Sequence, residues 1–466
     1  MIDTQEIRKK ILSLALTGKL VEQNSSDTPA HQLVESLSGS LNNHPFENDI
    51  SAQEIPYEIP DSWVWCRLSD IGTTNIGLTY HPQDVAEDGT IVIRSSNIIK
   101  GKMDYADLVK VKCQIRENQY LKRNDIVICA RNGSKALVGK CAIYEGDSDV
   151  ISFGAFMAIF RTPFFQYAYL YFNSPVFRRN FSNDDSKQIN QVTQNILKNS
   201  LIPIPPEEEQ KRITDKINSV FSFLDTIDTL QSQYQENLVT LKSKIIDAGI
   251  QGKLTEQLPE DGNAEELYQQ IQREKLALEK AGKIKKSKPL LPISDEEKPF
   301  DIPENWKWVK LGNVITLVSG TDFKPEDYND SGIGMPYMTG ASNIENDKLI
   351  INRWTPCPRN IAYEGDLLLV CKGSGFGKLV ICNVSEAHIA RQFMSIRPYY
   401  GVDVNYVKAV MINSFQIIKE AGKGLIPGVD RDTVLNIPLP LPPIAEQKRI
   451  VAKQEELLPL CEKGQS

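Results

Sequence analysis

The chain of 466 residues contains few of the residue types from which metal and catalytic sites are usually built. It has only four histidines, and none is spaced with another histidine or a cysteine as a zinc site requires. Its eight cysteines include no Cys-x-x-Cys pair, so we expect reduced thiols in a cytoplasmic protein and no disulfide framework. No apolar run approaches the roughly 20 residues of a membrane span, and the N-terminus lacks the layout of a signal peptide.

Motifs for catalysis are also missing. Gly373–Leu379 is reminiscent of a phosphate-binding loop, but the gap between its glycines is too short and no Ser or Thr follows the lysine. The glycine pattern of dinucleotide-binding turns is absent. Adenine methyltransferases carry an Asn- or Asp-Pro-Pro-aromatic tetrapeptide, whereas Glu207 and Ile444 follow the two Pro-Pro pairs of this chain. We therefore expect a protein that binds and does not catalyse.

Positive charge is scarce overall but is concentrated in two regions. The net charge of −7 excludes a uniformly basic nucleic-acid coat. Residues 90–142, however, carry eleven Lys or Arg against four Asp or Glu, and residues 348–431 carry eleven against six. A local basic face is the electrostatic footprint of DNA binding, and ordinary solvated surface charge is the alternative explanation.

The most informative feature that is present is an internal repeat. IPDSWVWCRL at 59–68 returns as IPENWKWVKL at 302–311, and IPIPPEEEQKRI at 202–213 returns as LPLPPIAEQKRI at 439–450. Between these segments, DIVICARNGS has a looser counterpart in DLLLVCKGSG. Such self-similarity predicts two copies of one structural unit.

A third repeated segment is circularly permuted. LKSKIIDAGIQGKLTEQ at 241–257 matches IRKKILSLALTGKLVEQ at 7–23. In the middle of the chain this segment follows the Glu-Gln-Lys-Arg motif, whereas at the ends that motif lies near the C-terminus and its continuation at the N-terminus. We therefore expect the two termini to meet and to complete a pseudo-two-fold ring with the central segment.

The central segment has the spacing of a coiled coil. From Ile213 to Ile245, apolar residues recur at alternating intervals of four and three, with Gln231 in one seam position. The terminal segments that begin at Ile7 and at Ile450 keep the same spacing. We expect the terminal helices to pack antiparallel on the central one; an isolated amphipathic helix on a globular core is the alternative.

The pattern predicts an α+β fold in five regions. Residues 50–205 and 298–442 alternate short β-branched runs with helical stretches and are the two expected α+β domains. The other three regions are an N-terminal helix at 1–49, a central helical region and linker at 206–297, and a C-terminal helix at 443–466. Together these helices form the expected antiparallel coiled coil that separates the two domains.

Candidate DNA-binding residues lie in loops that follow the predicted strands. Arg and Lys donate to guanine, and Asn and Gln pair with adenine, at about 1–3 kcal/mol of discrimination for each good pair. For any one of these residues, a turn or surface role is an equal alternative. The candidates in the first domain are Arg94, Ser96, Asn97, Arg131, Asn132, Lys135, Gln188 and Asn190, and those in the second are Thr339, Ser342, Asn343, Lys372, Ser374, Lys378 and Lys423.

The two Ile-Pro-x-x-Trp openings, the twin Pro-Pro-x-x-Glu-Gln-Lys-Arg-Ile segments and the Gly-Lys-Leu-x-Glu-Gln motifs, in circular order, resemble the specificity (S) subunit of Type I restriction–modification enzymes. The resemblance covers essentially the whole chain. It implies two target recognition domains that each read one half of a bipartite, asymmetric site in double-stranded DNA. The helices would set the spacer and dock two methyltransferase (modification) subunits.

The resemblance also implies a non-catalytic chain without its own cofactor or metal. S-adenosylmethionine would belong to the methyltransferase partner, and ATP and Mg to the motor–nuclease (restriction) subunits. Two rival hypotheses are a two-lobed protein scaffold that does not bind DNA and a stand-alone fused restriction enzyme. The absent catalytic motifs argue against the second rival.

Overall fold

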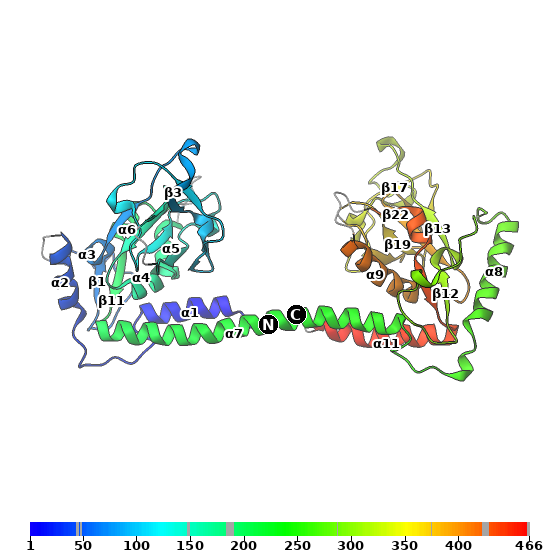
Figure 1. The fold of residues 1–466 in the computed structure, drawn as a ribbon, viewed down its shortest axis with the longest axis horizontal. Coiled ribbons are helices and arrows are strands. Elements are labelled where there is room, and N and C mark those ends of the chain that lie inside the picture. The colour runs from blue at the N-terminus through cyan, green and yellow to red at the C-terminus, as the bar shows by residue number, and fades with distance from the viewer. Residues whose placement is uncertain are drawn as a thin grey trace. The chain divides into compact units, whose positions relative to one another are not determined.

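The computed structural model describes residues 1–42, 46, 49–146, 150–182, 191–286, 288–373, 375–421 and 428–463. The chain forms two compact units, residues 1–231 (the first unit) and 232–466 (the second unit). Each unit contains one α+β domain and a share of the long helices (Figure 1). Within the described ranges, no helix is both long and apolar enough to cross a membrane.

The longest element is α7 (Glu207–Ile250), a helix of 44 residues that runs from the first unit into the second. At 1.5 Å per residue it is about 66 Å long. It begins directly after the Pro205–Pro206 pair, and three glutamates in its first turn complement the positive end of the helix dipole. Gly252 follows the helix with φ +69°, and a β-carbon there would collide with Pro303.

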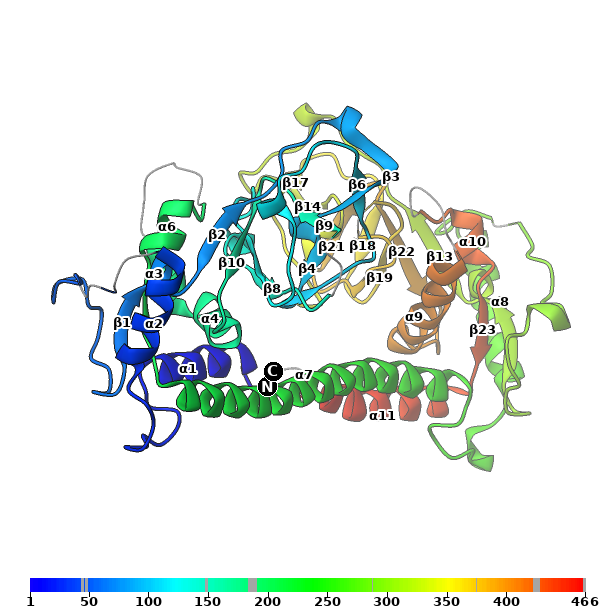
Figure 2. The same ribbon diagram turned by 60° about the vertical axis from the view of Figure 1, so that its left-hand side comes forward.

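In the first unit, α1 (Thr4–Leu16) packs antiparallel on α7, as the heptad spacing predicts (Figures 1 and 2). Thr4 Oγ1 donates to Asp228 Oδ1 at 2.5 Å, near the start of α1. The polar seam residue Gln231 is satisfied by the backbone of Ile2, since its Oε1 accepts from Ile2 N at 2.7 Å and its Nε2 donates to Ile2 O at 3.2 Å. The seam glutamine therefore holds the N-terminal segment in register.

In the second unit, α11 (Ile444–Lys463) packs antiparallel on the other half of α7, which also confirms the prediction. Cys461 belongs to one apolar cluster with Leu238, and Lys242 pairs with Glu462 at 3.2 Å. The heptad spacing also predicts a buried Tyr234, but this side chain is 50% exposed. The prediction is wrong at Tyr234, which lies between Gln231, bonded to Ile2, and Leu238, clustered with Cys461.

The domain of the first unit contains a four-stranded antiparallel sheet in the order β2-β10-β7-β8, a three-stranded sheet β6-β3-β9, and the two-stranded pairs β1-β11 and β4-β5. Its strands are β1 (Val64–Arg67), β2 (Thr73–Ile76), β3 (Val85–Ile93), β4 (Ile98–Ile99), β5 (Lys102–Met103), β6 (Val109–Val111), β7 (Ile126–Cys129), β8 (Cys141–Ile143), β9 (Ile151–Phe153), β10 (Met157–Arg161) and β11 (Leu201–Ile204). Its helices are α2 (Ala30–Asn42), α3 (Leu68–Ile71), α4 (Phe165–Phe172), α5 (Pro175–Ser182) and α6 (Gln194–Asn199).

The domain of the second unit has a closely similar topology, with sheets β13-β22-β19-β20, β17-β14-β21-β18, β12-β23 and β15-β16, and differs by the additional strand β18 in its second sheet. Its strands are β12 (Lys307–Lys310), β13 (Ile315–Ser319), β14 (Met335–Met338), β15 (Ile344–Glu345), β16 (Lys348–Leu349), β17 (Trp354–Thr355), β18 (Ile361–Tyr363), β19 (Leu367–Val370), β20 (Leu379–Ile381), β21 (Glu386–Ile389), β22 (Phe393–Pro398) and β23 (Pro438–Leu441). Its further helices are α8 (Ala264–Lys280), α9 (Val404–Ala421) and α10 (Arg431–Leu435).

The repeated motifs of the first unit meet at one buried carboxylate. Glu209, fully buried in the first turn of α7, accepts from Trp63 Nε1 at 2.9 Å and from Gln23 Nε2 at 2.6 Å. One turn on, Arg212 pairs with Asp27 at 2.6 Å. Burial raises the pKa of Glu209, and the two hydrogen bonds oppose that rise. The start of α7 is thereby fixed to the Ile-Pro-x-x-Trp segment and to the turn that follows α1.

The second unit repeats this cluster with residues from the matching motifs. Glu446 in the first turn of α11 accepts from Trp306 Nε1 at 2.7 Å and from Gln257 Nε2 at 2.5 Å. Arg449 pairs with Asp261 at 2.5 Å. Gln257 after α7 therefore occupies the place that Gln23 after α1 occupies in the first unit. The circularly permuted repeat in the sequence thus corresponds to a repeat in the structure.

Two tryptophans of the first unit offer a matched test of the carboxylate cluster. We predict that Trp63→Phe destabilises the first unit by about 1.5–3 kcal/mol more than Trp65→Phe, because it removes a hydrogen bond to a buried carboxylate. The Trp65 indole is equally buried, and its N–H has no hydrogen-bond partner among the described residues. Urea denaturation measures the difference, and hydrogen exchange of residues 439–450 is the internal reference. Equal destabilisation by the two variants would contradict the role given to Glu209.

Candidate nucleic-acid interface

Three segments that the sequence analysis selected in the first domain lie together. Asn132 Nδ2 donates to Ser95 Oγ at 3.1 Å and so joins the loop after β7 to the loop after β3. Arg131 forms an isolated β-bridge with Gln191, the first described residue after the gap that precedes α6. We call residues 94–97, 131–135 and 191 the first loop cluster.

The second domain brings together the corresponding segments. Lys372 forms an isolated β-bridge with Gly428, as Arg131 does with Gln191. The loop after β19 touches the loop after β14, because Gly375 approaches Ala341 so closely that a β-carbon on the glycine would lie 2.1 Å from Ala341 Cβ. We call residues 339–343, 372–373, 375–378 and 428 the second loop cluster.

Six of the candidate side chains are exposed in these clusters, and the five others that the structure describes are buried or half-buried. The exposed ones are Ser96, Arg131, Lys135, Ser342, Lys372 and Lys378. Among the residues that the structure describes, none of the four exposed cations has an ion-pair partner. Arg94 is half-buried and pairs with Asp107 at 2.8 Å, while Asn132 and Thr339 are half-buried and hydrogen-bonded within their loops.

Two predicted base readers are buried loop anchors. Asn97 and Asn343 have 1% and 0% exposure. The Oδ1 of Asn97 accepts from Arg94 N at 2.9 Å, and that of Asn343 accepts from Thr339 N at 2.8 Å. Their amide nitrogens donate to backbone carbonyls of the next turn. Neither amide faces solvent, so these two asparagines shape the loops that carry the exposed candidates.

Four candidates lie outside the described residues: Gln188, Asn190, Ser374 and Lys423. Their placement relative to the two clusters stays a prediction.

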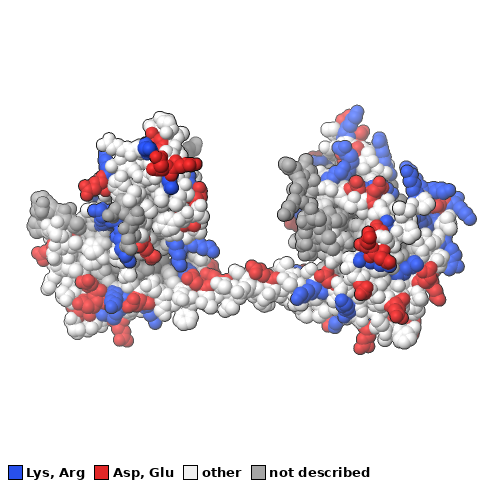
Figure 3. Space-filling view, viewed as in Figure 1, with Lys and Arg blue, Asp and Glu red and all other residues white. Residues whose placement is uncertain are grey.

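Several cations of the two domains form ion pairs within the fold. Besides Arg94, Arg161 forms a bidentate pair with buried Asp125, and Arg397 pairs in the same way with Asp366. On the face drawn in Figure 3, Lys and Arg are interspersed with Asp and Glu on both lobes and form no continuous patch there. Positive potential therefore depends on local features such as the unpaired cations of the loop clusters.

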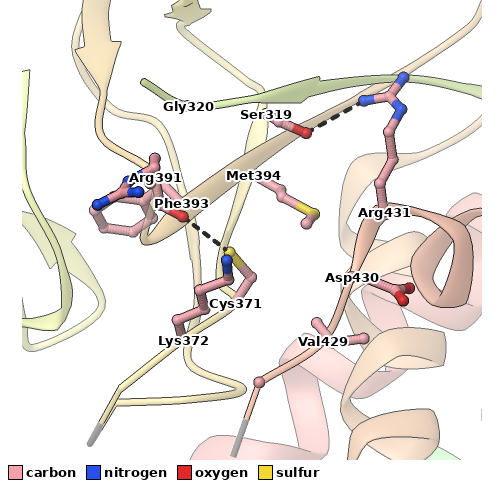
Figure 4. A pocket seen from close by; sticks show the side chains of 11 residues that line it. Ser319, Gly320, Cys371, Lys372, Arg391, Phe393, Met394, Val429, Asp430 and Arg431 are labelled. Carbon is pink, nitrogen blue, oxygen red and sulfur yellow. Dashed lines mark hydrogen bonds between the residues drawn. The ribbon is translucent and has the colours of Figure 1, made fainter. Parts of the chain in front are cut away.

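A cavity of about 490 Å³ opens beside the second loop cluster (Figure 4). It lies between the end of β13, the end of β19, the start of β22 and the segment before α10. Lys372 and Arg391 approach it from one side, and Arg431 approaches from the other. Arg431 Nη1 donates to Leu317 O at 2.7 Å, and Arg391 pairs with Asp322 at 2.6 Å. The edge that carries the second loop cluster is thus concave and rich in cations.

Sequence reasoning missed one pair of exposed residues at these edges. Phe156 precedes β10, is 61% exposed, and lies with its ring centroid 5.9 Å from the Arg131 guanidinium carbon. Gln392 precedes β22 at the corresponding place and is exposed. The signal that could have found them is the position directly before the strand that pairs with the candidate loop's own strand, namely Phe156 before MAIFR and Gln392 before FMSIRP.

The described residues thus form two α+β domains of similar topology, each with exposed cations at the ends of paired strands and each fixed to a long helix. The family model described as the Type I restriction modification DNA specificity domain matches residues 60–235 and 303–463, which is more than half of the chain. The chain therefore belongs to the family of Type I restriction–modification specificity subunits, as its motifs indicate.

Individual comparisons agree with this family. The specificity subunit of the Type I restriction enzyme EcoAI from Escherichia coli is 27% identical over an alignment of 541 positions. The alignment covers 98% of this chain and 90% of that protein. The crystal structure of the HsdS subunit from Thermoanaerobacter tengcongensis aligns with a TM-score of 0.52 at 19% identity over 89% of this chain and 94% of its own. A chain from work on complex assembly and conformational transition of the type I R-M system aligns with a TM-score of 0.63 at 19% identity, over 88% of this chain and 93% of that one. The solved structures confirm the α+β fold.

Arg131, an exposed cation of the first loop cluster, gives a direct test of the interface. We predict that Arg131→Ala lowers affinity for the duplex that the wild-type chain selects from a random pool by about 5- to 150-fold, the equivalent of one base contact. Lys216→Ala, which removes an exposed lysine from α7, should leave affinity unchanged. Fluorescence anisotropy at fixed salt measures both variants. Wild-type affinity in Arg131→Ala would remove this residue from the interface.

Proposed function

We propose that each unit reads one half of a bipartite, asymmetric target in double-stranded DNA. The observation that carries this proposal is that the two loop clusters lie at corresponding strand ends and differ in side chains and in loop length. Arg131 and Lys372 occupy corresponding places, and each forms the same β-bridge to the segment before a short helix. Two corresponding sites of unequal chemistry are what a chain needs to read two different half-sites.

The chemistry of the exposed residues suits base and phosphate contacts. Arg131 carries a guanidinium that can donate bidentately to guanine O6 and N7. Lys135 and Lys378, on the same loops as the bridging cations, are suited to phosphate contacts, which position a protein on the duplex without specifying sequence. Ser96 and Ser342 lie on the neighbouring loops. Their hydroxyl groups can hydrogen-bond to bases or to phosphates.

In this proposal α7 sets the number of unread base pairs between the two halves. Its 44 residues join the two units without a break in the helix. The carboxylate clusters at Glu209 and Glu446 fix a helix start to each domain, so a change in helix length would be passed on to the spacing of the half-sites.

We further propose that the helices dock two methyltransferase subunits. Large apolar side chains are exposed along them in each unit: Phe223 and Leu230 are 70% and 57% exposed in the first, and Val239 and Leu460 are 61% and 58% exposed in the second. Burying such side chains is the main favourable term in most protein association. S-adenosylmethionine would then be held by the methyltransferase partner, and ATP and Mg by a motor–nuclease subunit, while this chain contributes recognition only.

Salt dependence separates a DNA reader from a protein scaffold. We predict that affinity for duplex DNA falls linearly with salt on a double-logarithmic plot, because cations that contact phosphates release counterions. Titrating labelled duplex at several salt concentrations gives the slope. No detectable duplex binding at low salt, with or without methyltransferase partners, would favour the scaffold hypothesis.

Helix length can be changed without disturbing the terminal helices. An insertion of seven residues between Gln231 and Leu238 adds about 10.5 Å and nearly two whole helical turns, so the heptad register is kept. We predict that the spacer of the methylated target lengthens by about three base pairs. The control is an insertion of the same seven residues after Gly282, which lies in the linker beyond α8 and should leave the spacer unchanged. Methylome sequencing gives both spacers, and an unaltered spacer in the first variant would show that α7 is not the ruler.

A further inference from the structure

Two backbone hydrogen bonds beside the loop clusters are the same in both units. In the first unit, Ala130 N donates to Phe156 O at 2.9 Å and Val192 N donates to Ala130 O at 2.8 Å. In the second unit, Cys371 N donates to Gln392 O at 2.8 Å, and the amide of the residue after Gly428 donates to Cys371 O at 3.0 Å. Phe156 and Gln392 are therefore equivalent positions, one on each domain.

These equivalent positions differ in chemistry. Phenylalanine offers an apolar face and no hydrogen bond, whereas glutamine offers one acceptor and two donors. In both units the main chain of this residue makes the structural hydrogen bonds, and its side chain makes none with a described residue. The side chains are thus available for a ligand without cost to the fold.

Phe156 lies beside the cation that we assign to base contact. Its ring centroid is 5.9 Å from the guanidinium carbon of Arg131, and the ring is 61% exposed. The exposed ring offers an apolar surface, and its burial against a ligand would be favourable. In the major groove, the apolar group that a protein can contact is the 5-methyl group of thymine.

Gln392 lies across the second loop cluster. Gly340 comes so close to it that a β-carbon on the glycine would lie 2.1 Å from Gln392 Oε1, so the absence of a side chain at 340 makes room for the glutamine. The amide thereby lies over the loop that also carries Ser342 and faces the side of Gly373. An amide held at the edge of a concave, cationic surface is suited to bidentate pairing with adenine N6 and N7.

We propose that Phe156 and Gln392 are a pair of specificity-determining residues, with Phe156 contacting a thymine methyl group in one half-site and Gln392 pairing with an adenine in the other. This inference rests on the proposed function. Since Arg131 lies 5.9 Å from the Phe156 ring and base pairs are stacked about 3.4 Å apart, the half-site of the first unit should contain a guanine within about two steps of that thymine.

The experiment exchanges the two side chains in the chain assembled with its methyltransferase partners. Phe156→Gln, Gln392→Phe and the conservative control Phe156→Leu are each selected against a randomised duplex pool, and bound sequences are read out for both half-sites. We expect Phe156→Gln to lose its preference for thymine at one position of one half-site, by about 5-fold or more, and to keep the other half-site. Gln392→Phe should lose an adenine preference in the other half-site, and Phe156→Leu should retain the wild-type target.

Base analogues test the same contacts in the wild-type protein. The proposal can therefore be tested even where a variant fails to fold. Uracil in place of the assigned thymine removes only the methyl group, and 7-deaza-adenine removes only the N7 acceptor. Each is expected to lower wild-type affinity by about 5-fold or more. Unchanged half-sites in both exchange variants, or unchanged affinity for both analogues, would overturn this inference and leave the proposed function standing. A wild-type chain that selects no sequence at all would overturn the proposed function itself.

Discussion

The buried carboxylate at the first turn of a helix is the interaction on which each unit depends. Glu209 binds an indole N–H from the Ile-Pro-x-x-Trp segment and an amide from the Gly-Lys-Leu-x-Glu-Gln segment, and Glu446 does the same in the second unit. An unpaired buried carboxylate would cost several kcal/mol, so the folded state requires both donors. Three stretches that are far apart in the sequence are thereby tied to one point. This explains why the repeat preserves a tryptophan, a glutamine and a glutamate rather than apolar residues of similar size.

The buried carboxylate of each unit fixes the start of a helix relative to the domain of that unit. In the first unit, β1 pairs with β11 directly before α7, and Tyr167 Oη donates to Pro203 O in the last residues of β11. In the second unit, β12 pairs with β23 directly before α11, and Tyr406 Oη donates to Pro440 O. A helix that begins at a doubly anchored strand cannot turn relative to its own domain without breaking buried hydrogen bonds. Each loop cluster is therefore held at a defined place relative to the helix start of its own unit.

The sequence predicted the parts of this structure that depend on spacing, and missed the parts that depend on partners. Heptad spacing was enough to place α1 and α11 on α7, and strand ends were enough to select loops that meet in space. Asn97 and Asn343 could not be told from base readers, because an asparagine after a strand has the same signature whether its amide closes a turn or faces DNA. Tyr234 keeps the seam spacing but is half exposed, because spacing does not show how far a partner helix extends. Phe156 looked like the first residue of an apolar strand, but it lies directly before β10 and its ring is exposed.

The two units differ in sequence at positions where main-chain atoms make the structural hydrogen bonds. They agree at positions where side chains make the structural contacts. Glu209 and Glu446, Arg212 and Arg449, and the buried pairs of Asp125 and of Asp366 all act through side chains, and each is repeated. Around Phe156 and Gln392 the structural hydrogen bonds come from main-chain atoms, which any residue supplies. A side chain there can change without loss of the frame, so recognition can diverge between the two domains while the fold stays the same. This division of labour accounts for a repeat that is strong at the helix starts and weak between them, and it places the variable chemistry at the exposed edges where a duplex would be read.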